Sequence, residues 1–153
     1  MKKGFSLIEL LVVVAIIGVL AGAGIVGYQG YLQGVREDSI NNQVAQLARG
    51  FQSAQIAAEN GLRGAGAGCT ETDTVQACLN ALADPLENPF TNLSLSGDFV
   101  ASCGTNPDIE VTSSLSGFVL GTTTMNGFDT ADTLTLTGCN DAGTAIGSTQ
   151  VTF

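Results

Sequence analysis

The sequence predicts an α+β fold in which one long N-terminal helix precedes an antiparallel sheet. A long apolar run near the N-terminus passes directly into an amphipathic helical pattern. After residue 92 the composition changes to Thr, Ser, Val, Gly and Leu, and apolar residues alternate with polar ones, as in half-buried strands. With 153 residues, the chain is long enough for one modest folded domain.

Charge and composition exclude several function classes. Five basic residues face fourteen acidic ones, which gives a net charge of −9, and every charged residue after Arg63 is acidic. Nucleic-acid binding needs clustered Lys or Arg, so no nucleic-acid partner is expected. The chain has no histidine and no recognisable catalytic or nucleotide-binding motif, so we expect neither an enzyme nor a cofactor.

The apolar run from Leu10 to Val26 is long enough to cross a bilayer as a helix. Lys2 and Lys3 precede it and should stay cytoplasmic, so the remainder of the chain should be exported. Glu9 lies at the start of this run, although a carboxylate at mid-membrane depth costs ~2.5–3.5 kcal/mol. A secretory signal peptide fits poorly, because the basic leader is very short and no A-x-A site precedes a compact polar start. An ordinary signal anchor would explain the lysines and the run but not Glu9.

The segment KKGFSLIEL, residues 2–10, resembles the class III signal of type IV pilins and type II secretion pseudopilins. The resemblance covers roughly residues 2–32 and implies the pilin fold, a long helix packed on a sheet. It implies that a prepilin peptidase cleaves between Gly4 and Phe5 and methylates the new terminus at Phe5. It also implies that Glu9 pairs with the buried terminus of a neighbouring subunit, where an unpaired charge would be costly.

The helix departs from the family pattern in one respect. Many pilins carry a proline about twenty residues into the mature helix, where this chain has Val26. The same region is instead rich in glycine, which weakens a helix by ~1 kcal/mol per residue relative to alanine. Local unwinding in a filament and close helix packing both remain open as explanations. The glycines are Gly18, Gly22, Gly24, Gly27, Gly30 and Gly34.

The pattern divides the chain into five segments. They are a leader (1–4), a transmembrane and filament-core helix (5–35), an amphipathic helix (36–60), a connector with a short helix (61–91) and a sheet region (92–153).

The amphipathic stripe consists of Ile40, Val44, Leu47, Phe51, Ala54 and Ala58, and Asn60-Gly61 supplies a stop signal. We expect Asp73 to cap the short helix, which should end before Pro85. Candidate strands are 92–96, 99–102, 109–112, 117–123, 133–137 and 149–153.

All the cysteines, Cys69, Cys78, Cys103 and Cys139, follow the apolar run, and an oxidising periplasm favours disulfides. Zinc is disfavoured because the chain has neither a C-x-x-C pair nor a histidine. Three connectivities are open. We expect Cys69–Cys78, which would tie the short helix to its lead-in. We also expect Cys103–Cys139, which resembles the disulfide-bounded C-terminal region of many pilins.

The stretch DPLENPF, residues 84–90, partly resembles an element of major pseudopilins, although we favour a proline-rich turn after a helix as its explanation. Pseudopilins of that group bind calcium through C-terminal oxygen ligands. By this resemblance Asp129, Asp132 and Asp141 become weak calcium candidates, but the chain has no EF-hand-like spacing. Solvated loop charges are the competing interpretation.

The resemblance implies a major pilin that polymerises through its N-terminal helix into a surface filament. Its expected partners are identical subunits in a helical filament, the prepilin peptidase, the inner-membrane assembly platform and membrane lipid before assembly. Before assembly it would be a single-pass inner-membrane protein with a periplasmic C-terminal domain, and afterwards part of an extracellular pilus. The alternatives are a type II secretion pseudopilin and a minor pilin that acts as an adhesin or in DNA uptake.

Overall fold

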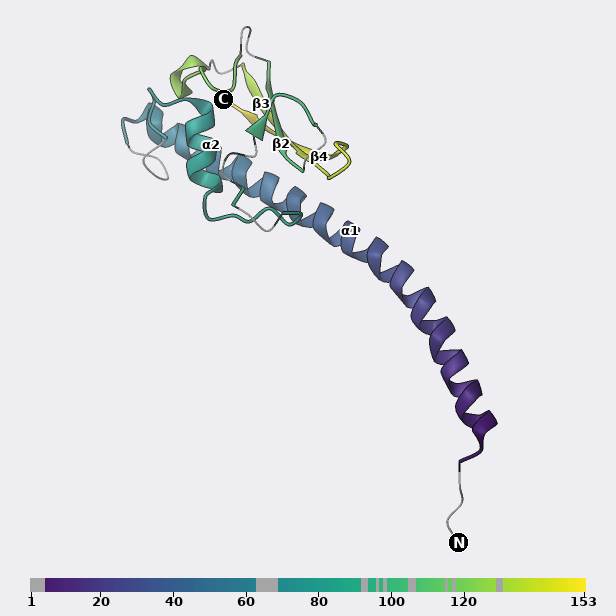
Figure 1. Cartoon of the computed structure of the whole chain (residues 1–153). Coiled ribbons are helices and arrows are strands. Elements are labelled where there is room, and N and C mark those ends of the chain that lie inside the picture. Colours follow the sequence, from purple (N-terminus) through teal and green to yellow (C-terminus); the bar gives the residue numbers. More distant parts are fainter. Residues whose placement is uncertain are drawn as a thin grey trace. The chain divides into compact units, whose positions relative to one another are not determined.

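The computed structural model describes residues 5–62, 69–91, 94–95, 97, 99–104, 107–114, 116, 118–128 and 131–153. The chain forms two compact units, Met1–Val35 and Arg36–Phe153. Figure 1 shows the elements in chain order, which are α1 (Leu7–Glu59), α2 (Val75–Ala83), β1 (Phe99–Val100), β2 (Ile109–Ser113), the 3₁₀ turn η1 (Met125–Gly127), β3 (Thr133–Cys139) and β4 (Ala145–Thr152). The predicted α+β class is confirmed.

In the second unit α1 is amphipathic, and its predicted stripe forms one side of the core. Ile40, Val44, Leu47, Phe51, Ala54 and Ala58 are all buried. The helix ends at the predicted Asn60-Gly61 signal. Gly61 has a φ of 67°, and the N–H groups of Gly61 and Leu62 donate to the carbonyls of Ala58 and Ala57. This is the Schellman pattern, which glycine favours because it adopts positive φ without a steric penalty.

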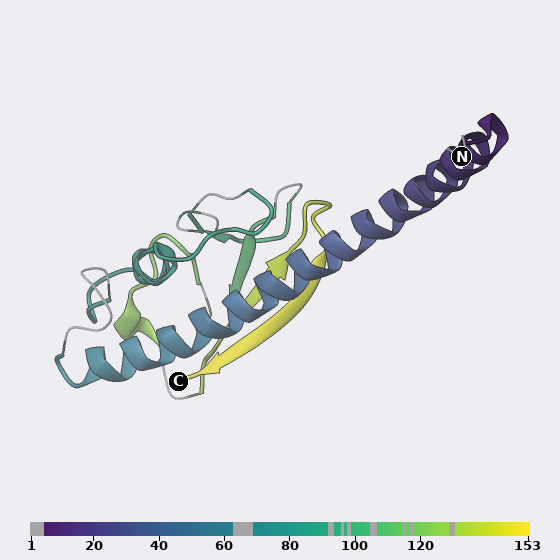
Figure 2. The same ribbon diagram turned by 90° about the horizontal axis from the view of Figure 1, so that it is seen from below.

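The sheet has the strand order β1-β2-β3-β4 and is mixed rather than antiparallel. β2, β3 and β4 pair antiparallel, whereas β1 pairs with β2 in parallel, through Phe99 with Ile109 and Val100 with Glu110. The expected purely antiparallel sheet is therefore wrong at this edge. Figure 2 shows β4 running alongside the part of α1 that belongs to the second unit.

The strand predictions differ in their outcome. The expected strands at 99–102, 109–112 and 133–137 overlap β1, β2 and β3, and the one at 149–153 overlaps β4, which begins earlier, at Ala145. The strand expected at 117–123 is wrong, because the N–H groups of Thr122 and Thr123 donate to the Val119 carbonyl and close a turn. Most of the strand expected at 92–96 lies outside the described residues, namely 92, 93 and 96. Of its described residues, Ser94 forms an isolated bridge with Glu87, and the Leu95 N–H donates to the Leu86 carbonyl, so neither belongs to a strand of the sheet.

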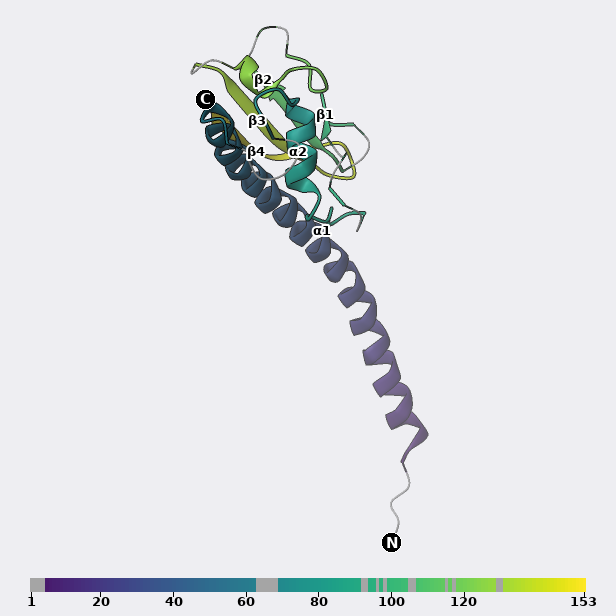
Figure 3. The ribbon, with the colours of Figure 1, turned by 90° about the vertical axis from the view of Figure 1, so that its left-hand side faces the viewer.

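The core lies between α1, α2 and the inner face of the sheet. α2 contributes Val75, Cys78 and Leu79, and the sheet contributes Ile109, Val111, Leu134, Leu136 and Val151, all buried. Helix α2 lies beside α1 (Figure 3). Gly50 leaves room for Leu82, whose Cδ2 atom lies 3.4 Å from the position that a Cβ at Gly50 would occupy. An aromatic group closes one end of the core. Phe153 stacks on Phe128 at a centroid distance of 4.1 Å and meets Phe51 edge-on.

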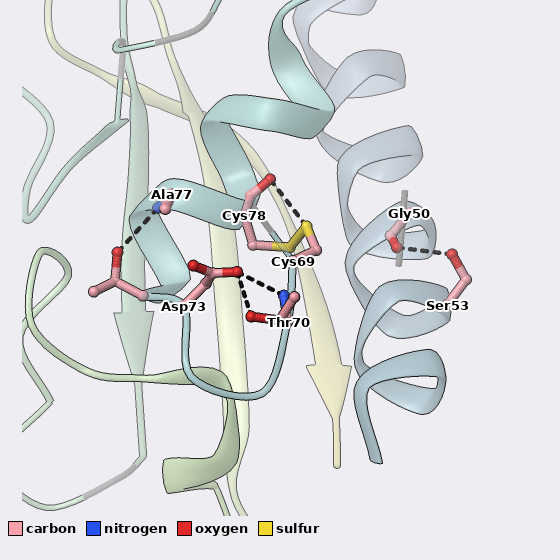
Figure 4. The surroundings of a disulfide bond; sticks show 8 residues. Gly50, Ser53, Cys69, Thr70, Asp73, Ala77 and Cys78 are labelled. Atoms are coloured by element: carbon pink, nitrogen blue, oxygen red, sulfur yellow. Dashed lines mark hydrogen bonds between the residues drawn. A yellow bond between two sulfur atoms is a disulfide. The ribbon is translucent and has the colours of Figure 1, made fainter. Parts of the chain in front are cut away.

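The cap of α2 is Thr74 rather than the predicted Asp73. The Thr74 hydroxyl accepts a hydrogen bond from the Ala77 N–H at 3.2 Å, as an N-cap side chain does. The Asp73 carboxylate instead accepts hydrogen bonds from the backbone N–H and the hydroxyl of Thr70 (Figure 4). Asp73 thereby closes the turn that leads into α2.

Candidate functional site

The first unit exposes an apolar helix on all sides. From Leu7 to Val26, α1 presents Leu, Ile and Val side chains that are about half or more exposed, and Ile8, Val19 and Val26 reach 68%, 74% and 74%. By length and composition this helix can cross a membrane, and none of its most apolar 18-residue window is buried. Burying apolar surface contributes ~25 cal/mol per Å². The stretch therefore requires a lipid or protein environment.

Phe5 and Glu9 lie at the beginning of this helix. Phe5 is 81% exposed, and the Glu9 carboxylate accepts a hydrogen bond from the Ser6 backbone N–H at 3.1 Å. α1 begins at Leu7, so Ser6 occupies the N-cap position and Glu9 the third helical position. A carboxylate at that position stabilises a helix start in the capping box S-x-x-E. Our sequence reasoning missed this second role of Glu9, although the Ser6-to-Glu9 spacing carried the signal.

Glu9 is surrounded by apolar side chains. Phe5, Ile8, Val12 and Val13 line a shallow groove with it. In water such a carboxylate is solvated, but a second apolar helix laid over the groove would remove that water. A carboxylate buried in this way is tolerated only when a cation or hydrogen-bond donors pair with it. Gly4, the residue before the expected cleavage point, lies outside the described residues.

The glycines of the first unit have no packing role within the single chain. A Cβ added at Gly18, Gly22, Gly24, Gly27, Gly30 or Gly34 would meet nothing within 4 Å. α1 is helical through all of these positions. Neither the unwinding hypothesis nor the close-packing hypothesis is decided by this, since both concern contacts with other chains.

In the structure both disulfides have the expected pairing. Cys69 is bonded to Cys78, nine residues further on, and holds the lead-in segment against α2 (Figure 4). Cys103 is bonded to Cys139, at a sequence separation of 36. The second bond connects the segment between β1 and β2 to the end of β3. A covalent bond therefore fixes the segment that follows β1, the short parallel edge strand, to β3.

The calcium candidates do not form one site. Asp132 precedes β3 and Asp141 follows it, so this seven-residue strand separates them by on the order of 20 Å. Calcium ligands lie 2.3–2.6 Å from the ion, so these two carboxylates cannot share one. Asp129 lies outside the described residues. The Glu110 carboxylate approaches Cys103 and Cys139, but their disulfide removes the thiolates that a metal would need.

The stretch from Asp84 to Phe90 is a turn fastened to its surroundings. Asn88 is buried, donates to the Pro107 carbonyl at 2.7 Å and accepts from the Phe90 N–H. The Gln43 side chain on α1 donates to the Glu87 carbonyl at 2.7 Å. These hydrogen bonds give Asn88 a structural role in the turn that follows α2.

Comparison with known proteins gives a family model that matches the N-terminus of the chain and relatives that match part of its length. A family model described as the prokaryotic N-terminal methylation motif matches residues 1–25. Type IV major fimbrial proteins FimA of Dichelobacter nodosus are 34% identical over 61 residues and 38% identical over 53 residues. These matches cover 40% and 35% of this chain.

The matched region spans 39% and 34% of those relatives, so the chain aligns with well under half of their length. No solved structure matches the chain. The methylation motif lies over Phe5, Glu9 and the exposed apolar helix that the structure describes. Together, the methylation motif and the similarity to type IV major fimbrial proteins support the assignment of this chain to the type IV pilin family.

Proposed function

We propose that this chain is a structural subunit, a major pilin, that polymerises into a type IV pilus through the first half of α1. The observation that carries the proposal is the apolar helix from Leu7 to Val26, exposed on all sides and beginning in a methylation motif. The relatives it matches are named major fimbrial proteins. A helix that is apolar all round is stable in lipid or in a bundle of like helices, and a filament core supplies the latter.

The proposed sequence of events uses the same helix twice. A prepilin peptidase would cleave after Gly4 and methylate Phe5, and the subunit would wait in the inner membrane with its C-terminal domain in the periplasm. An assembly platform would then transfer the helix from lipid to the centre of a growing extracellular filament. The transfer exchanges one apolar environment for another, so the apolar surface stays covered throughout.

Glu9 would determine the register of each added subunit. Once apolar helices cover the groove beside Phe5 and Glu9, the carboxylate needs a positive partner, and the methylated amine of a neighbouring Phe5 would supply it. The structure adds a competing explanation, since Glu9 also caps its own helix through Ser6. Gln serves in the capping box as well as Glu does, but it carries no charge. The two explanations therefore predict different behaviour for Glu9→Gln.

The test compares Glu9→Gln with Glu9→Ala. We measure subunit in the sheared surface fraction against subunit in the membrane fraction. Under the charge-pairing proposal both variants insert normally and both assemble at least about tenfold less than the unaltered chain, because an unpaired buried charge costs ~3–5 kcal/mol. Glu9→Lys should be the most defective. Normal filaments from Glu9→Gln, with a defect only in Glu9→Ala, would assign Glu9 to capping alone.

A type II secretion pseudopilin is the second candidate, favoured by the partial resemblance of residues 84–90. A minor pilin at a filament tip is a third, although the acidic balance after Arg63 disfavours DNA as its ligand. Negative-stain microscopy of sheared cell surfaces separates these candidates. Long filaments that label along their whole length with an antibody to this chain support a major pilin. Labelling confined to the ends, or the absence of long filaments, contradicts it.

A further inference from the structure

On the outer face of β2 and β3, both described throughout, one carboxylate lies among threonines. Along both strands buried residues alternate with exposed or partly exposed ones, and Glu110 pairs directly with Thr137. Strands favour threonine over glutamate, because a β-branched side chain packs well on a pleated surface. The glutamate is therefore the exception on this face. The outward positions are Glu110, Thr112, Thr133, Thr135 and Thr137.

The exceptional carboxylate lies beside the Cys103–Cys139 bond. A carboxylate oxygen of Glu110 and the two sulfur atoms all lie within 4.8 Å of one another. In the described part of the chain, Glu110 is the one carboxylate grouped in this way with both sulfurs of a disulfide. Its backbone is fixed, because its strand neighbours Ile109 and Val111 are both buried in the core.

The two sulfurs of this bond differ in accessibility. Cys139 is 0% exposed, whereas Cys103 is only partly buried, so a thiolate from solution can reach only the Cys103 sulfur. Its attack forms a mixed disulfide at Cys103 and breaks the bond to Cys139. The electron pair leaves on the Cys139 sulfur, which then takes up a proton. A second thiolate displaces the first from Cys103 and completes the reduction.

We propose that Glu110 protects the Cys103–Cys139 bond against reduction by thiolates. Glu110 opposes the reaction at two points. An approaching thiolate is negative, so the carboxylate repels it. The departing Cys139 thiolate forms in a buried position beside the same carboxylate, where both burial and the like charge disfavour an anion. A poorer leaving group slows thiol–disulfide exchange further.

This inference concerns the folded C-terminal domain and does not depend on polymerisation. The competing interpretation is an ordinary solvated glutamate at an outward strand position. The two interpretations differ in what happens when the charge is removed without changing the size of the side chain. Only a protecting carboxylate makes the rate of reduction depend on the charge of the attacking thiol.

The test measures how fast small thiols open the bond in the purified full chain, kept in detergent at physiological ionic strength. Three thiols of similar size are compared, the anionic mercaptoethanesulfonate, the neutral mercaptoethanol and the cationic cysteamine. Acid quenching and mass spectrometry of peptides then quantify the mixed disulfide at Cys103. Glu110→Gln should accelerate mercaptoethanol about fivefold, mercaptoethanesulfonate more and cysteamine less. Each thiol is compared between chains, so its own thiolate fraction cancels.

Glu59→Gln is the matched control, because it removes the same charge from an exposed position on α1. Ile40 lies against Gly138, the neighbour of Cys139, and Glu59 follows about 28 Å further along the helix. Charges that far apart are screened at physiological ionic strength, so Glu59→Gln should leave all three rates unchanged. The Cys69–Cys78 bond is the internal reference, and its reduction should not respond to Glu110→Gln.

Several results would overturn the inference. They are unchanged rates in Glu110→Gln, a similar acceleration in Glu59→Gln, or equal acceleration of all three thiols. Equal acceleration, together with faster attack on the Cys69–Cys78 bond, would show that the substitution opens the domain. Glu110→Asp keeps the charge and should retain most of the protection. Rates in Glu110→Asp that match those in Glu110→Gln would contradict a role for the charge.

Discussion

Gly138 of β3 lies directly opposite Gly147 of β4, and this glycine pair receives the side chains of α1. A Cβ at Gly138 would lie 3.2 Å from Ile40 Cγ2, and one at Gly147 would overlap the Asn41 amide oxygen. Asn41 also donates to the Ile146 carbonyl at 3.4 Å. The two strands thus form a shallow seat in which α1 lies. A larger residue at Gly138 or Gly147 would fill this seat.

Gly147→Ala should destabilise the second unit by about 1–3 kcal/mol, the usual cost of overpacking. The added methyl group must displace Asn41 and break its bond to Ile146. Thermal unfolding followed by circular dichroism measures the loss, and Gly104→Ala, at an exposed glycine with open space around it, is the control. Adding Asn41→Ala to Gly147→Ala should recover part of the loss, since neighbouring substitutions couple. Strictly additive effects would show that the two residues do not meet.

Asn140→Ala should cost about 1–3 kcal/mol, because it removes three hydrogen bonds that the buried Asn140 side chain makes to its turn and to α1. Asn140 is 7% exposed, accepts from the N–H groups of Ala142 and Thr144, and donates to the Glu37 carboxylate at 3.3 Å. The same unfolding measurement applies. Asp141→Ala, in the same turn but exposed, should change stability by less than about 0.5 kcal/mol. Equal effects from both variants would contradict the anchoring role of Asn140.

Removing the two disulfides should have unequal effects. The chain-entropy relation gives about 4 kcal/mol for the pair Cys103→Ser and Cys139→Ser, and about 2.5 kcal/mol for Cys69→Ser and Cys78→Ser. The difference follows from the separations of 36 and 9 residues.

Thiol labelling of secreted protein without reductant should find almost no free thiol. Because Cys69, Cys78 and Cys139 are fully buried, the labelling must be done in denaturant, where their shielding is lost. Four reactive thiols under those conditions would contradict both bonds.

Processing at Gly4 should be visible by mass spectrometry. The methylation motif over residues 1–25 leads us to expect Phe5 as the first residue of surface material, with one added methyl group. Gly4→Leu is the control, since a bulky residue at the cleavage point should leave the leader attached in the membrane fraction. Surface filaments that still carry Met1 would contradict the family's processing scheme for this chain.

Periodicity in the sequence was sufficient to predict α1, its buried stripe and its end at Gly61, because each depends on residues a few positions apart. The seat formed by Gly138 and Gly147 could not be predicted, since it depends on strand register over long range. The parallel edge at Phe99 was equally hidden, because a strand of only two residues carries no periodic signal. At the candidate site, Glu9 was identified from the free-energy cost of placing a carboxylate in lipid. The hydrogen bond by which Glu9 caps the helix at Ser6 was overlooked.

The Cys103–Cys139 bond also limits how the chain can respond to mechanical load. A chain under tension lengthens by at most ~3.3–3.6 Å per released residue. The segment between the two cysteines, which contains β2 and β3, cannot be extended by a pulling force while the bond is intact. Its 36-residue separation corresponds to on the order of 120 Å of contour length. The Cys69–Cys78 bond withholds a further ~30 Å. A filament of such subunits would resist stretching through covalent rings, so its extensibility would depend on the oxidation state of its surroundings.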